Sequence, residues 1–145
     1  SYRNLAGVDI SGMDFTGTIL TGSDLTNTIL TGVDLSGMDF TDTILKRADL
    51  SGVNLSNAIL INANLENATL ENAKLLDANL DSTNLTNADL RNALLVDANL
   101  SNATLTGSDL TGAILTGAIL TGADLENAVL TDAILNCVGH HICVS

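Results

Sequence analysis

Large apolar side chains recur at every fifth position along almost the whole chain. From Leu5 to Leu135, all twenty-seven of these positions are occupied by Leu, Ile or Phe. A spacing of five fits neither the three-and-four spacing of an amphipathic helix nor the alternation of a flat strand. An unbroken short repeat instead indicates a solenoid, in which each repeat packs against its neighbours. We call the large apolar residue of each repeat its central residue.

The positions on either side of the central residue also follow a rule. The residue two positions earlier is small, and it is Ala in fifteen of the twenty-seven repeats. Because residues two apart in extended backbone point to the same side, this residue and the central residue are expected to face inward together. The residue two positions later is Gly, Asn or Asp in twenty-four of twenty-six repeats. These residues favour tight turns, so each repeat is predicted to be a short strand followed by a corner.

Two segments show the repeat in its clearest form. Residues 88–92 read Ala-Asp-Leu-Arg-Asn and residues 123–127 read Ala-Asp-Leu-Glu-Asn. They resemble the A(D/N)LXX unit of the pentapeptide-repeat family, and the resemblance covers nearly the whole chain. It implies an all-β fold, a right-handed quadrilateral parallel β-helix with four repeats per coil and about seven coils. We predict this solenoid over residues 1–136, followed by a short C-terminal capping tail over residues 137–145.

The composition makes the chain acidic and argues against several classes of function. Seventeen Asp and Glu residues against five Lys and Arg residues give a formal net charge of −12, the opposite of what direct nucleic-acid binding requires. No run of eighteen apolar residues occurs, so no membrane insertion is expected. The sequence has no Ser/His/Asp arrangement and no phosphate-binding glycine loop. We therefore expect no enzyme activity, no catalytic residues and no cofactor.

The leading hypothesis is a non-enzymatic structural or protein-interaction scaffold with an unknown protein partner and biological role. The alternative comes from the family resemblance, which includes acidic rods that mimic DNA and modulate DNA gyrase, a type II topoisomerase. Residues twenty apart should stack on one face of the coil, and Ile29, Thr69 and Val129 would interrupt the longest acidic column. The members of this column are Asp9, Asp49, Asp89 and Asp109. The repeat contains no insertion, so the resemblance does not extend to members with projecting loops.

An apolar stripe is predicted on the third face, which carries Phe15 and the residues stacked on it at intervals of twenty. Its outward positions in the later coils are Leu76, Leu94, Val96, Ile114 and Ile134. A contiguous exposed apolar stripe is typical of a contact surface. Outward isoleucines such as Ile19 and Ile44 also occur singly, so simple tolerance of Ile is the alternative. We hypothesise that the stripe forms a homodimer or binds another protein.

The C-terminal tail holds the only site-like chemistry in the sequence. Cys137, His140, His141 and Cys143 fall within seven residues, whereas a tetrahedral zinc site normally draws on two separated pairs, so no metal is predicted. A disulfide between Cys137 and Cys143 would close a short loop over the last coil, and two free thiols are the alternative. Family members in thylakoid lumens resemble this chain in having a terminal disulfide. Oxidised cysteines favour a periplasm or thylakoid lumen, and reduced cysteines favour the cytoplasm.

The N-terminal part contains an internal copy. Residues 8–15 recur almost unchanged as residues 33–40, an offset of twenty-five. Because one face should repeat every twenty residues, the copy is expected on a neighbouring face. The copy would place the residues of any face-specific site on a different face, so we expect no face-specific site in the N-terminal part.

Overall fold

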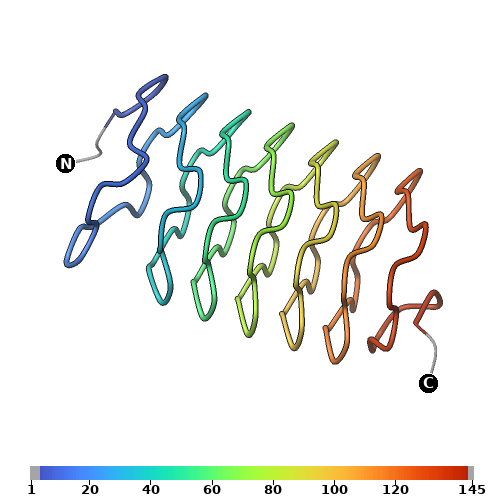
Figure 1. Cartoon of the computed structure of the whole chain (residues 1–145). Helices are drawn as coiled ribbons and strands as arrows, with labels where there is room; N and C mark the ends of the chain where they lie inside the picture. Colours follow the sequence, from blue (N-terminus) through green and yellow to red (C-terminus); the bar gives the residue numbers. More distant parts are fainter. Residues whose placement is uncertain (1–3, 144–145) are drawn as a thin grey trace.

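The chain winds into one continuous coil whose turns stack along a single axis (Figure 1). The computed structural model describes residues 4–143. From Asn4 with Asp24 to Ile114 with Ile134, the residue before a central residue pairs in parallel with the residue twenty positions later, except at Asp14 and Ile19. Four five-residue repeats therefore complete each turn, as the family resemblance implied. Each side of a turn contributes one bridged residue rather than a longer strand.

The four sides of the coil form four faces. We number them by the central residue of the first turn, so that Leu5 lies on face 1, Ile10 on face 2, Phe15 on face 3 and Leu20 on face 4. Every later residue belongs to the face of the residue twenty positions before it, because consecutive turns pair at that interval.

The central residues form the core. From Leu20 to Leu120, every central side chain is at most 1% exposed. The small residues beside them are also buried, and several of these are hydroxyl residues instead of Ala. Their hydroxyls donate to backbone carbonyls, as in the 2.8 Å hydrogen bond from Thr83 Oγ1 to Leu60 O. These polar groups are tolerated inside because their hydrogen bonds are satisfied.

The corners have the backbone conformation that the sequence predicted. The residue two positions after the central residue has positive φ throughout the regular coils, for example 61° at Asn57 and 72° at Gly117. The outward Asp or Asn of each repeat often supports the corner. Asp49 Oδ1, for instance, accepts hydrogen bonds from the N–H and the hydroxyl of Ser51 at 3.0 and 2.6 Å. Such Asx turns explain why Asp and Asn recur before the central residue.

Both ends depart from the regular coil. At the C-terminal end, Val138 pairs with Ile119, nineteen residues away instead of twenty. The N–H of Cys137 donates to Leu135 O at 2.8 Å, which tightens the chain at this point. Coil pairing therefore continues two residues beyond position 136. Near the N-terminal end, the first two turns are paired on faces 1 and 2 but not on faces 3 and 4.

Candidate functional site

The apolar stripe on face 3 is continuous. Lys74, Leu94, Ile114 and Ile134 pair in consecutive turns and form one column. Two residues further along each turn, Leu76 and Val96 form a second column beside it, so the structure brings all five predicted residues onto one face. Four of the five are half-buried, while Ile134 is 46% exposed. Their role as an interface stays a prediction.

Two further apolar residues lie on the adjacent face 4. Ile119 and Val138 pair with each other and are 40% and 54% exposed. Ile119 has the same place in its repeat as Ile114, so the sequence contained the signal needed to find it. Val138 could not be found in this way, because its position depends on the one-residue shift in the last turn. The apolar surface is therefore wider at the C-terminal end than the sequence indicated.

Polar residues border the stripe. Lys74 precedes Leu94 in the column, is exposed, and forms no salt bridge with any residue in the range 4–143. Thr116 continues the column of Leu76 and Val96 and is also exposed. An apolar strip with a polar border is the arrangement expected of a surface that contacts another protein.

The acidic column on face 2 is interrupted and partly neutralised. Ile29 pairs with both Asp9 and Asp49, and Thr69 pairs with both Asp49 and Asp89. Arg91 forms a 2.6 Å salt bridge with Asp89 and a 3.2 Å one with Glu71. The hydrogen bond from Arg91 lowers the pKa of Asp89, which is therefore charged but compensated. Asp9, Asp49, Asp89 and Asp109 share a face, but they do not form the even row of charges that a DNA backbone presents.

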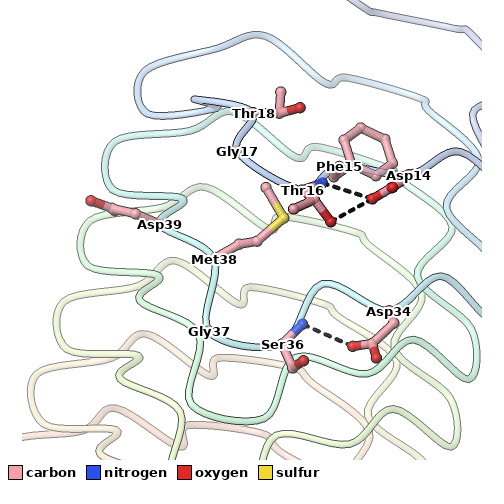
Figure 2. A pocket seen from close by; sticks show the side chains of 10 residues that line it. All are labelled: Asp14, Phe15, Thr16, Gly17, Thr18, Asp34, Ser36, Gly37, Met38 and Asp39. Atoms are coloured by element: carbon pink, nitrogen blue, oxygen red, sulfur yellow. Dashed lines mark hydrogen bonds between the residues drawn. The ribbon is translucent and has the colours of Figure 1, made fainter.

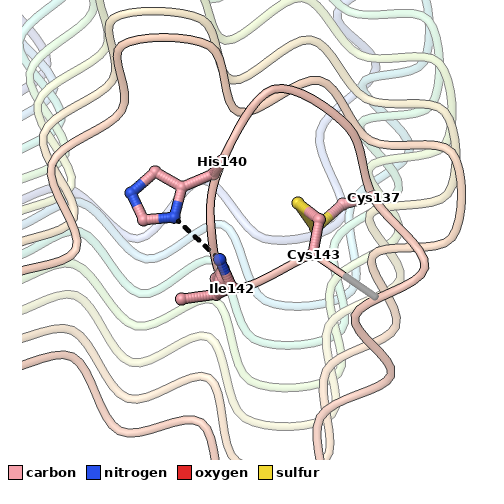
Figure 3. Close-up of a disulfide and its surroundings, with 4 residues drawn as sticks. All are labelled: Cys137, His140, Ile142 and Cys143. Carbon is pink, nitrogen blue, oxygen red and sulfur yellow. Dashed lines mark hydrogen bonds between the residues drawn. A yellow bond between two sulfur atoms is a disulfide. The ribbon is translucent and has the colours of Figure 1, made fainter. Parts of the chain in front are cut away.

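The tail closes into a loop at the C-terminal end (Figure 3). Cys137 and Cys143 form a disulfide with their Cα atoms 4.9 Å apart. Within the loop, His140 Nδ1 accepts a 3.4 Å hydrogen bond from the N–H of Ile142. Burial and, to a smaller extent, the neighbouring His141 lower the pKa of His140. This favours the neutral imidazole that the hydrogen bond requires.

The tail does not form a metal centre in the described part of the chain. No group of three or more His, Cys, Asp or Glu residues within 4–143 is arranged to hold a metal ion. The two histidines instead border a hollow of about 330 Å³ between the loop and the last turn. Over the same residues, no helix has the length and apolarity that crossing a membrane requires.

The fold and its surfaces define a class of protein, the parallel β-helical solenoid that exposes flat faces. The chain belongs to the pentapeptide-repeat family. The family model described as "Pentapeptide repeats" matches in overlapping segments, from residues 9–47 to residues 115–138. The predicted family and the right-handed quadrilateral β-helix are thereby confirmed.

Solved structures of other pentapeptide-repeat proteins are similar to this chain. Rfr23 from the cyanobacterium Cyanothece 51142 is 36% identical with a TM-score of 0.71, over 77% of this chain and 91% of that one. HetL from the cyanobacterium Nostoc, involved in heterocyst differentiation regulation, is 31% identical with a TM-score of 0.57. The match covers 97% of this chain and 73% of HetL. A protein of the Arabidopsis thaliana thylakoid lumen is 34% identical with a TM-score of 0.55. The match covers 66% of this chain and 70% of the Arabidopsis protein. No curated protein sequence matches the chain.

Proposed function

We propose that this chain is a non-enzymatic protein-interaction scaffold and that the face 3 stripe is its binding surface. The observation that carries the proposal is the stacking of Leu76, Leu94, Val96, Ile114 and Ile134 over consecutive turns. A large apolar strip of this kind is unfavourable in water and is stabilised when another surface covers it. The family supports the same role, since its members generally act as structural or interaction scaffolds.

The partner that we propose for the stripe is a second copy of the chain. The turns that carry the stripe pair regularly at intervals of twenty residues and contain no inserted loop, so a second rod can approach along their length. A two-fold axis through Ile114 would place the same apolar columns of both copies against each other. Such a homodimer would remove the stripe from water on both copies at once.

Sedimentation velocity of the wild type and two variants tests this proposal. Ile114→Asp puts a charge in the middle of the stripe, which an interface would have to desolvate, so the variant should shift toward monomer. Ile29→Asp is the matched control, because Ile29 is 41% exposed and its two partners in the face 2 column are Asp9 and Asp49 rather than apolar residues. A wild type that is monomeric at high concentration would remove the basis for self-association. If both variants shifted equally toward monomer, the shift would be due to the added charge and not to the stripe.

A role as a DNA mimic that binds DNA gyrase is the second candidate. The net charge of −12 supports it, whereas the breaks in the face 2 column weigh against it. A supercoiling assay with the purified protein separates the two functions. A mimic that uses this column should inhibit gyrase, and Asp49→Asn with Asp109→Asn should weaken the inhibition. Absence of inhibition by the wild type would exclude gyrase as the target.

We also propose that the protein matures where disulfides persist, in a periplasm or a thylakoid lumen. The proposal is supported by the bond between Cys137 and Cys143 and by the similarity to a lumenal protein of Arabidopsis. Disulfides are rare in reducing compartments such as the cytosol. The redox state of these two cysteines in the purified protein is therefore informative about the compartment.

A further inference from the structure

The ladder between turns has one internal gap. Between the first and second turns, Asp9 pairs with Ile29 on face 2, but Asp14 and Asp34 on face 3 do not pair. Ile19 and Asp39 on face 4 do not pair either, whereas from residue 24 to residue 134 all four faces are paired at every turn. The first turn is therefore separated from the second along two adjacent faces.

The gap leaves backbone groups of both turns without ladder partners. The N–H groups of Phe15, Gly17 and Leu20 occupy positions that donate to the next turn elsewhere in the coil, and here they have no partner within residues 4–143. The N–H groups of Asp34 and Asp39, on the opposite side of the gap, also have no partner in that range. Two unpaired strand edges therefore face each other, which is unusual because such edges readily accept another strand.

Met38 lies at the gap. It occupies the position two residues before the central residue Phe40, where most repeats have Ala. Its longer side chain is only partly buried against the core, and it points toward Thr16 of the first turn (Figure 2). The cleft at the gap has a volume of about 620 Å³. Met38 is only partly buried, so its flexible side chain can move when another group enters.

The cleft is acidic. Asp14, Asp34 and Asp39 line it, and no Lys, Arg or His is among its lining residues. Asp14 Oδ1 accepts hydrogen bonds from the N–H and the hydroxyl of Thr16 at 2.8 and 2.6 Å, and these bonds lower the pKa of Asp14. A hydrogen bond from Ser36 lowers the pKa of Asp34 in the same way. Both carboxylates are therefore charged at neutral pH, and a basic ligand complements them.

We propose that this cleft binds a short extended peptide that carries Lys or Arg, added as a β-strand between the first two turns. An extended peptide presents N–H and C=O groups along both of its edges, so along one face it would pair with the turns on both sides of the gap. Its basic side chains would meet the three carboxylates. The site is independent of the face 3 stripe. It also departs from the expectation that the duplicated N-terminal part carries no face-specific site, because the two copies, residues 8–15 and 33–40, both contribute to the cleft.

The proposal is tested by titrating the isotope-labelled full chain with the peptide acetyl-Lys-Val-Lys-Val-Lys-amide. Chemical shift changes should concentrate at the face 3 amides of Phe15, Gly17 and Asp34, and the same amides should exchange more slowly with solvent. The acidic peptide with Glu in place of Lys should not bind. A basic peptide with N-methylated backbone should bind weakly, since it cannot complete the ladder.

Two variants show whether the gap itself is responsible. Met38→Ala restores the common small residue, so the first turn should close on the second and peptide affinity should fall by about tenfold or more. Met13→Ala is the matched control, because Met13 is 55% exposed and does not line the cleft, and its affinity should equal that of the wild type. Three results would overturn the proposal: amides already protected in the free wild type, no shifts at these amides with the basic peptide, or an equal response to the acidic one.

Discussion

At the scale of the residue, the place of a side chain within its repeat determines what it does. A central residue in the middle of the rod is packed between the central residues of the turns before and after it. Leu75 is fully buried in this way, whereas Leu5 at the end is only partly buried. Central and corner residues could be predicted from the sequence because their roles are repeated. The orientation of the Met38 side chain could not be predicted, because the repeat shows that this side chain is larger than the usual Ala without showing which way it points.

We predict that Leu75→Ala lowers the free energy of unfolding by about 2–5 kcal/mol, because it leaves a cavity in a close-packed stack. Leu5→Ala should have a clearly smaller effect, since its side chain is covered on one side only. Urea unfolding of both variants measures the difference. Equal losses would contradict a core built from stacked central residues.

The pH dependence of stability should reflect the Asx turns at the corners. The hydrogen bond from the Ser51 hydroxyl is the main cause that lowers the pKa of Asp49 below its ordinary value of 3.8. The pKa of Asp49 is lower in the folded chain than in the unfolded chain. Its carboxylate therefore contributes fully to the free energy of unfolding above about pH 4, and this contribution is lost as the pH falls through the folded pKa. Asp49→Asn keeps an acceptor that other repeats already use, as in the hydrogen bond from Ser56 to Asn54.

We therefore expect Asp49→Asn to unfold like the wild type at pH 7 and to lose less stability than the wild type between pH 5 and pH 3. Thermal unfolding across this range measures both effects. A variant that loses as much stability as the wild type on acidification would show that the Asp49 carboxylate does not contribute.

At the scale of the element, the turns in the middle of the rod pair regularly, and the turns at both ends do not. The register could be predicted only in part. Parallel turns must align identical repeats, which makes the offset a multiple of five, and the value of twenty came from the family resemblance. The gap after the first turn and the nineteen-residue last turn could not be predicted, since both are departures from the repeat that the repeat itself does not encode. The pairing of Val138 with Ile119 shows that the last turn bends into the tail rather than stopping at a repeat boundary.

The disulfide is the element-scale feature that is simplest to check. If Cys137 and Cys143 are bonded, alkylation without reductant should add no groups, and alkylation after reduction should add two. Intact mass gives the number directly. Two groups added without reductant would contradict the bond. Reduction should also increase hydrogen exchange at the C-terminal turn first, because the disulfide closes the loop next to that turn.

At the scale of the whole molecule, the chain is a rod whose faces differ in chemistry. Face 2 carries broken acidic charge, face 3 carries the apolar stripe, and the first two turns enclose the acidic cleft. The columns could be predicted once the register was known, because residues twenty apart stack. The identity of a partner could not, since the repeat dictates which residues are exposed and says little about what they meet.

The central functional claim is that the stripe on face 3 is covered by a second copy, and a pair of spin labels tests it most directly. Thr116→Cys and Thr31→Cys place a nitroxide label at equivalent exposed positions on face 3 and face 2, while the native cysteines remain in their disulfide. Neither change removes a residue of the stripe. We predict a strong dipolar coupling between copies for the label at position 116, as for a short distance, and a much weaker one for the label at position 31, which lies about four turns from the two-fold axis. Equal coupling at both positions, or coupling at position 31 alone, would contradict the account.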